Sequence, residues 1–135
     1  MKKFSLILLM AIVAFTSCKK LSGKDEVAPG NNDPNYDANN RVFRVKASST
    51  STFKLVIVEY GDDGVTPFNT ENADQSTDFD YGFTPVVGHK ITISIQSPDG
   101  VIKASALYKG NYLNPVPVKT SGSGSTADFS YTVND

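Results

Sequence analysis

The sequence has few of the residues that support disulfide, metal or nucleophilic chemistry. Its 135 residues include one cysteine, one histidine and no tryptophan. One cysteine excludes an intramolecular disulfide, and a zinc site would need partners that His89 lacks. His89 follows Gly88 and precedes an isoleucine-rich segment, so we expect it to lie in a turn. The nearest match to a nucleophile elbow is Gly122-Ser123-Gly124, which lies in a low-complexity run. We therefore predict a protein that is not an enzyme and that has no cofactor.

A strong excess of charge of one sign is also missing. The chain has 13 basic and 14 acidic side chains, a formal net charge of −1. Without residues 1–17, the balance becomes 11 basic against 14 acidic side chains, or −3. A nucleic-acid partner would need a basic patch, so we expect no nucleic acid among the partners.

One long apolar run is present, and it lies at the N-terminus. Residues 4–15 are apolar except for Ser5, and they follow Lys2 and Lys3. The core of a signal peptide has roughly 7–15 apolar residues, whereas a membrane-spanning helix needs about 20. The run is therefore typical of a signal peptide and too short to span a bilayer.

The residues after this run are Phe15-Thr16-Ser17-Cys18. They resemble the lipobox of bacterial lipoproteins, in which an apolar residue and two small residues precede the lipidated cysteine. Phe15 stands where leucine is usual, but it keeps the apolar character of that position. The resemblance implies that residues 1–17 are a signal peptide and that Cys18 carries acyl chains such as palmitate, which anchor the protein in a lipid bilayer.

The residues that follow Cys18 bear on where the anchor goes. Lys19 occupies the position where aspartate retains lipoproteins in the inner membrane, so the resemblance implies the outer membrane of a Gram-negative bacterium. Which side of that membrane the protein faces stays open. Glycine, proline and asparagine are frequent up to residue 40. This composition predicts a flexible tether, so residues 18–40 would hold the lipidated cysteine and the spacer.

Residues 41–135 carry the alternation that is typical of β-strands. Ile91, Ile93 and Ile95 alternate with polar residues, and the turn Ser97-Pro98-Asp99-Gly100 follows them. Residues 53–60 are apolar on both faces, which predicts a central strand covered twice. The clear strands are residues 43–47, 53–60, 79–83, 90–96, 101–108 and 127–133, with weaker ones near 65–70 and 116–120.

Short strands separated by turns at this spacing predict an all-β fold: a single immunoglobulin-like antiparallel β-sandwich of about seven strands. Residues 41–109 also resemble small outer-membrane lipoproteins with an immunoglobulin- or transthyretin-like sandwich, including MmpS-like accessory proteins. The shared pattern is an early apolar strand, a polar loop, Phe83-Thr84-Pro85, the isoleucine-rich strand and an Asp-Gly hairpin. The resemblance implies no catalytic residues.

Carboxylates are concentrated between residues 59 and 80, where no lysine or arginine occurs. Calcium prefers six to eight oxygen ligands, and Asp62, Asp63, Asp78 and Asp80 could supply carboxylates at one end of a sandwich. The spacing fits no known calcium loop. The alternative is a solvated loop whose charges keep a sheet edge from pairing with other chains.

Aromatic side chains give the last candidate site. Tyr108, Lys109, Asn111 and Tyr112 combine aromatic, cationic and amide groups, which suits contact with a glycan or a protein. Tyr108 shares a face with apolar residues, so packing in the core is the alternative for it. We therefore predict a membrane-anchored, non-catalytic accessory or interaction module, whose partner is an envelope protein or a polysaccharide. The alternative function is a calcium-stabilised adhesion-type or glycan-binding domain.

Overall fold

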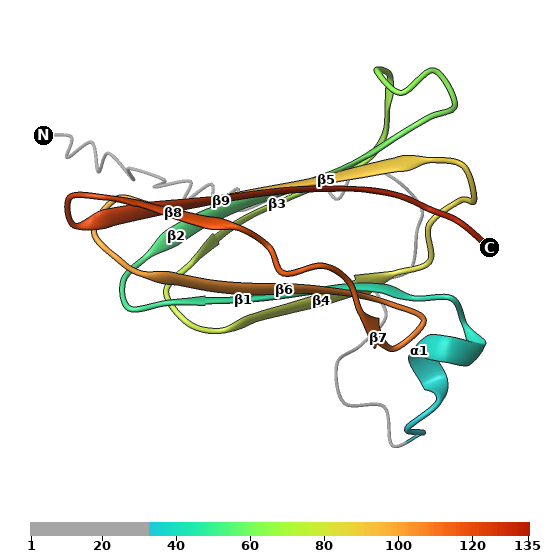
Figure 1. The fold of residues 1–135 in the computed structure, drawn as a ribbon, viewed down its shortest axis with the longest axis horizontal. Coiled ribbons are helices and arrows are strands. Elements are labelled where there is room, and N and C mark those ends of the chain that lie inside the picture. Colours follow the sequence, from blue (N-terminus) through green and yellow to red (C-terminus); the bar gives the residue numbers. More distant parts are fainter. Residues whose placement is uncertain (1–32) are drawn as a thin grey trace, which may run out of the picture.

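The computed structural model describes residues 33–135, which form two antiparallel sheets packed face to face (Figure 1). The first sheet has the strand order β4-β1-β6-β7 and the second has the order β3-β2-β5-β9-β8. The first contains β1 (Phe43–Ser49), β4 (Phe79–Phe83), β6 (Ile102–Tyr108) and β7 (Asn111–Tyr112). The second contains β2 (Phe53–Tyr60), β3 (Pro67–Gln75), β5 (Lys90–Ser97), β8 (Val118–Ser121) and β9 (Gly124–Thr132).

The predicted all-β antiparallel sandwich is confirmed, with nine strands rather than about seven. The strand order was not predicted. In an immunoglobulin constant domain the first two strands share a sheet. Here β1 pairs with β4 and β6, whereas β2 pairs with β3 and β5 in the opposite sheet.

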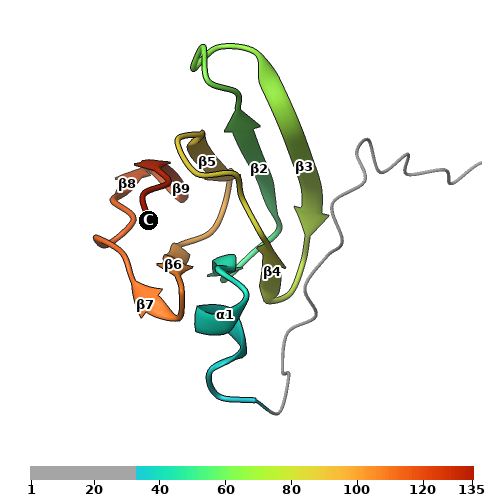
Figure 2. The ribbon, with the colours of Figure 1, turned by 90° about the vertical axis from the view of Figure 1, so that its right-hand side faces the viewer.

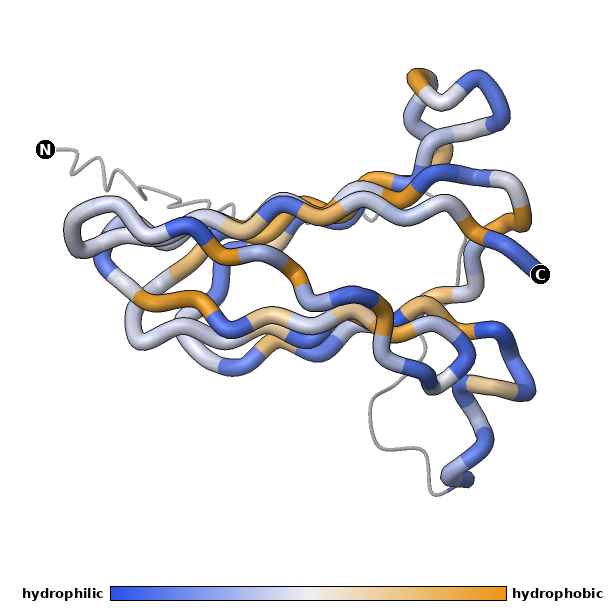
Figure 3. Tube along the Cα trace, viewed as in Figure 1, coloured by the Kyte–Doolittle hydropathy of each residue, from blue (hydrophilic) through white to orange (hydrophobic). Residues whose placement is uncertain are grey.

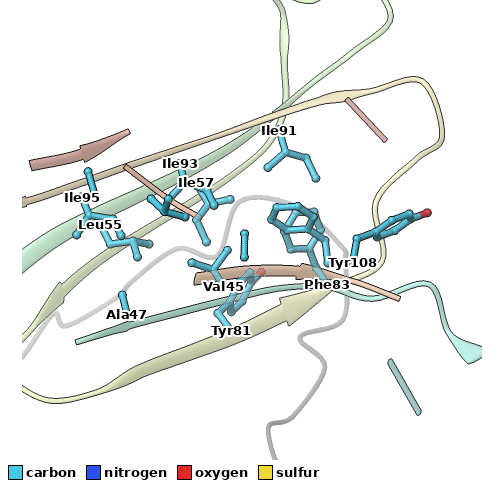
Figure 4. Close-up of a cluster of buried hydrophobic side chains, with 14 of the residues drawn as sticks. Val45, Ala47, Leu55, Ile57, Tyr81, Phe83, Ile91, Ile93, Ile95 and Tyr108 are labelled. Atoms are coloured by element: carbon cyan, nitrogen blue, oxygen red, sulfur yellow. The ribbon is translucent and has the colours of Figure 1, made fainter. Parts of the chain in front are cut away.

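The core lies between the two sheets and follows from the alternation in the strands. Ile91, Ile93 and Ile95 of β5 all point inward and are almost fully buried (Figure 4). They face the first sheet, where Val45 and Phe83 are buried as well. Every second residue of each inner strand therefore contributes apolar area to one layer, at roughly 25 cal/mol per Å² removed from water.

Strand β2 differs from the prediction because only one of its faces is covered. It is an interior strand, paired with β3 on one side and β5 on the other. Its inward residues are buried, whereas Val56, Val58 and Tyr60 are half-buried and Lys54 is exposed on the outer face. Val56 and Val58 therefore lie on the outer face of the sheet, where their β-branched side chains favour the strand conformation.

A short helix is bonded to the sandwich before residue 41, where the domain was predicted to begin. Helix α1 (Tyr36–Asn39) precedes β1, and Asp37 binds Arg44 of β1 through two bonds of 2.7 and 2.8 Å. A third bond of 2.9 Å joins Arg44 to Asp80 of β4. Residues 33–40 therefore belong to the folded part of the chain. No helix of residues 33–135 is long and apolar enough to cross a membrane.

The close approach of Arg44 to the sheet depends on a glycine. Arg44 pairs across the sheet with Gly82. A Cβ atom on Gly82 would lie 3.2 Å from the guanidinium carbon of Arg44 and 3.0 Å from a methyl group of Val42. Because Gly82 has no side chain, the guanidinium can lie flat over β4 between two carboxylates.

The two ends of the sandwich carry different segments (Figures 1 and 2). We call one end the α1 end: it holds α1, the loops 61–66 and 84–89, the turn at 109–110 and the C-terminus. The opposite, distal end holds the connections at 50–52, 76–78, 98–101 and 122–123. The strand pairing defines this division, because Tyr60 is level with Pro67 at one end and Phe53 with Gln75 at the other.

We expect Asp37→Asn to weaken the attachment of α1 and to remove an acid-dependent part of the stability. Hydrogen bonds from Arg44 hold the pKa of Asp37 below its ordinary value of 3.8. The stabilisation is therefore complete above about pH 3.8 and is lost as the pH falls through the lower folded-state pKa. The variant should lose about 1–2 kcal/mol at pH 7, because its carboxylate is partly exposed, and little at pH 2.

Urea unfolding of the wild type and the variant at both pH values measures this difference. Asp78→Asn is the matched control, because Asp78 is exposed and lies at the distal end. The control should change the free energy of unfolding by less than about 0.5 kcal/mol. An equal loss for Asp37→Asn at both pH values would contradict the proposed charge dependence.

Candidate functional site

The structure separates the four aspartates that the sequence suggested as calcium ligands. Asp62 and Asp63 lie in the loop after β2 at the α1 end, whereas Asp78 lies in the connection before β4 at the distal end. The eight residues of β2 span about 25 Å between these two ends. Asp80 lies in β4 of the other sheet, opposite Lys46, and is bonded to Arg44. The four carboxylates therefore do not form one site.

Two of these aspartates, Asp63 and Asp80, bind groups of the protein itself. Asp63 accepts hydrogen bonds from the backbone N–H groups of Val65 and Thr66 and from the Thr66 hydroxyl, which together lower the pKa of Asp63. Asp80 forms salt bridges of 2.9 Å with Arg44 and 3.5 Å with Lys46. Within residues 33–135 no three metal-binding side chains are arranged to hold an ion. Calcium binding itself stays a prediction.

The predicted aromatic site is divided between the core and the surface. Strands β6 and β7 join through a tight turn in which Lys109 and Gly110 both have positive φ, 53° and 77°. Tyr108 points inward and is buried, and its ring lies 5.7 Å from that of Tyr131. Tyr112 is 74% exposed, and Asn111 is exposed next to it. Three of the four predicted residues, Lys109, Asn111 and Tyr112, therefore share the surface of this hairpin.

A buried pair at the α1 end, formed by the carboxyl group of Glu59 and the imidazole of His89, was missed in the sequence analysis. The side chain of Glu59 is fully buried, and its Oε1 atom lies 2.9 Å from Nδ1 of His89. The same oxygen accepts a hydrogen bond of 2.8 Å from the backbone N–H of Val86. The ring of Phe68 meets the imidazole edge-on, with 4.8 Å between the ring centres.

This pair holds three segments together. The contact of Nδ1 of His89 with Glu59 orients the ring so that Nε2 points toward Asp62, 3.6 Å away. Glu59 is the last residue but one of β2, Val86 and His89 belong to the loop before β5, and Phe68 is the second residue of β3. Nδ1 of His89 is thus held by the buried Glu59, which fixes the loop, whereas Nε2 faces the exposed Asp62 at a distance beyond a hydrogen bond.

One sequence pattern could have identified Glu59. It follows Phe53, Leu55 and Ile57 at the same period of two, so it occupies an inward position of β2. A carboxylate at such a position requires a buried partner. The solvated loop considered for the acidic stretch does not include Glu59, which is buried in the predicted strand 53–60. It does not include residues 71–75 either, which extend the edge strand β3 beyond the predicted residue 70.

Exposed apolar side chains lie near the Glu59–His89 pair. Val65, on the β2–β3 connection, is 73% exposed, and Phe68, near the start of β3, is 50% exposed. Val86 and Val87 are exposed on the neighbouring loop. Figure 3 shows hydrophobic segments at the α1 end, including the tip of the projecting loop. This end therefore combines the buried Glu59–His89 pair with exposed apolar side chains around it. We call these side chains, together with Tyr112 of the neighbouring hairpin, the apolar rim.

The distal end carries a groove of about 440 Å³ on the outer face of the second sheet. Lys54 forms its centre, because Lys54 pairs with Asp74 of β3 on one side and with Gln96 of β5 on the other. Gln75 and Pro98 complete the wall. Neighbouring positions on one face lie about 5 Å apart, so an ammonium, a carboxylate and an amide form one short row.

Comparison with protein-family models, with curated proteins and with solved structures finds no match for this chain. The resemblance of residues 15–18 to a lipobox thus stays a prediction, and Cys18 lies outside the described residues. The function has to be inferred from the groove, the α1 end and the sequence pattern.

We expect Glu59→Ala to cost about 2–4 kcal/mol of stability, because Val86 N–H and His89 Nδ1 would both lose their buried acceptor. Glu59→Gln should cost less, since its carbonyl oxygen can still accept one of the two bonds. Denaturant unfolding measures both variants.

Asp62→Ala is the control for the second contact of His89. Asp62 is 93% exposed, so this pair should contribute less than about 1 kcal/mol. Equal losses for Glu59→Ala and Asp62→Ala would show that the pair at Glu59 does not hold the loop.

Proposed function

We propose that this chain is a lipid-anchored, non-catalytic lipoprotein of the bacterial outer membrane whose sandwich binds an envelope polysaccharide. The distal groove is the observation that carries this proposal. It lies at the end of the sandwich opposite to α1, and therefore away from Asp33, where the described chain begins. A ligand can thus reach the groove while the chain is attached to a bilayer.

The chemistry of the groove supports a polysaccharide. Its volume of about 440 Å³ falls in the usual range of ligand sites, roughly 300–1,000 Å³. Lys54 donates hydrogen bonds, Asp74 accepts them, and the amide of Gln96 does both, which suits ligands rich in hydroxyl groups. Lys54 and Asp74 have no ion-pair partner within residues 33–135, so both remain available to a ligand.

The residue types in the groove argue against a protein ligand at this site. Energetically dominant residues of protein interfaces are enriched in tryptophan, tyrosine and arginine. None of these types lines the groove. The polar row and the ring of Pro98 leave a shallow surface that fits an extended polymer better than a side-chain anchor.

The buried ionisable groups support a binding role over catalysis. His89 faces Glu59 and Asp62, and Arg44 faces Asp37 and Asp80. Each of these groups joins separate segments of the fold. A catalytic acid or base has to reach a substrate proton, which a group enclosed by structural partners does not do.

Cys18→Ala tests the anchor. The wild-type chain should sediment with the outer-membrane fraction, and its N-terminal peptide should carry the mass of the attached acyl chains. The variant should leave the membrane fraction, because lipid burial at about 0.8 kcal/mol per CH₂ provides the attachment. Fractionation and mass spectrometry measure both results. A variant that still sediments, or an unmodified Cys18 in the wild type, would contradict the anchor.

Lys54→Ala combined with Gln96→Ala tests the groove. Affinity electrophoresis of the lipidated chain in gels that contain envelope polysaccharide should show retardation of the wild type. The double variant should bind at least about tenfold more weakly, since each lost hydrogen bond contributes around 1 kcal/mol. Lys103→Ala is the matched control, because Lys103 is an exposed lysine of β6 on the other sheet.

The outcomes separate the two classes of ligand. Retardation that is lost in the double variant and kept in Lys103→Ala supports the polysaccharide site. No retardation of the wild type, or cross-linking of Lys54 to an envelope protein alone, would refute it.

A further inference from the structure

We propose that the α1 end lies against the surface of a zwitterionic phospholipid bilayer, with Phe68, Val86 and Val87 in contact with lipid. The inference rests on the lipid anchor proposed above and adds a second, non-covalent contact of the domain itself. It also assigns an orientation, because it directs the distal groove away from the membrane.

The exposed apolar side chains are distributed unevenly. Within residues 33–135, seven large hydrophobic residues are exposed, and five of them lie at the α1 end. These five are Val65, Phe68, Val86, Val87 and Tyr112. Of the other two, Val101 lies in the β5–β6 connection at the distal end and Val118 lies on the edge strand β8. Such a gathering of apolar side chains at one end marks a contact surface.

The position of Asp33 points to the bilayer as the partner. Asp33 precedes α1, so the described chain begins at the α1 end. The 15 peptide steps from Cys18 to Asp33 span at most about 50 Å, whatever their conformation. Thr84 links this part to the apolar loop, because its hydroxyl donates a hydrogen bond of 3.0 Å to the carbonyl of Asn40. The lipid that holds Cys18 therefore lies within about 50 Å of Asp33, at the end of the domain that carries the apolar rim.

Attachment also changes how strong the contact has to be. A linker of this length keeps the second partner at an effective concentration near the millimolar range. A few apolar side chains, too weak to bind vesicles from solution, are then sufficient to hold the domain on the surface. The anchor supplies the affinity, and the rim sets the orientation.

The shape of the rim fits a flat partner. Its residues come from the loop 61–66, the start of β3, the loop 84–89 and the hairpin at Tyr112, on both sheets. They are spread over the end of the sandwich instead of lining one concave pocket. Tyr112 has an apolar ring with a polar hydroxyl, a combination that is favoured at membrane interfaces.

The charges at this end select the type of lipid. Apart from the Arg44 cluster, this end carries the acidic residues Asp33, Asp62, Asp63 and Asp135 and the basic residues Arg41, Lys90 and Lys109. The two signs nearly balance, so an anionic surface gains little attraction and repels the loop. Zwitterionic headgroups, whose ammonium groups can approach Asp62, fit this pattern.

The buried pair of Glu59 and His89 presents the rim in a fixed geometry. Phe68 packs on His89, and the backbone of Val86 is bonded to Glu59. The Phe68 ring and the Val86 backbone are therefore fixed by protein contacts before they meet the lipid, so little conformational entropy is lost on contact.

Single tryptophan reporters test the proposal, because the chain contains no tryptophan. Phe68→Trp, Val87→Trp and the distal control Val101→Trp are each prepared in the full lipidated protein. They are reconstituted in vesicles of phosphatidylcholine and phosphatidylethanolamine with brominated acyl chains. The first two reporters should lose at least about half of their emission to bromine quenching, because contact depths of about 5–10 Å reach the acyl region. Val101→Trp should keep its emission.

A second variant pair separates docking from anchoring. Val86→Asp with Val87→Asp, introduced beside Phe68→Trp, should abolish the quenching while the protein still sediments with the vesicles. Equal emission of the proximal and distal reporters in protein that sediments would overturn the docking and leave the anchor intact. Quenching that is absent in these vesicles, with a blue shift that requires added envelope protein, would assign the rim to a protein partner and overturn it as well.

Discussion

The isoleucine row of β5 lies between β2 and β9 and faces the four-stranded sheet, so it forms the centre of the apolar layer that joins the two sheets. The chain passes from one sheet to the other after β1, β3, β4, β5 and β7, so each sheet is completed by segments that are far apart in sequence. Neither sheet can keep its shape without the layer between them. The two ends, with their different surfaces, exist only because this layer fixes the register of every strand.

Two buried polar clusters modify this apolar layer, and both lie at the α1 end. Arg44 joins α1 to β1 and β4, and Glu59 joins β2 to the loop before β5. Charges taken out of water are costly unless each is paired and hydrogen-bonded. Both clusters meet that condition, so they determine the positions of α1 and of the loop 84–89. At the distal end the buried polar groups are uncharged: the hydroxyl of Ser97 donates to the carbonyl of Thr52, and that of Ser125 donates to the carbonyl of Gly100. The groove beside them carries Lys54, Asp74 and Gln96 on its surface.

The sequence predicted strands where period-two alternation combines with burial on one face. Strands β2 and β5 were located closely because Phe53, Leu55 and Ile57, and then the isoleucines, repeat without interruption. Strand β3 extends to Gln75, beyond the predicted residue 70, because an edge strand with polar residues on both faces shows no alternation. Strand order, the Arg44 cluster and the groove depend on which strands become neighbours. Pairing of residues such as Lys54, Asp74 and Gln96 arises only in three dimensions and leaves no local pattern.

The placement of β1 has a mechanical consequence. Strand β1 is hydrogen-bonded on both sides, to β4 and to β6, and the chain reaches it directly from α1. A pull between the membrane and a polymer held at the distal groove would act along the axis of β1, nearly perpendicular to its interstrand hydrogen bonds. Those bonds would share the load instead of breaking one after another, and the Arg44 bonds to Asp37 would bear it first. The fold therefore places β1, which is paired on both sides, in line with the force that the proposed anchor and the proposed groove would transmit.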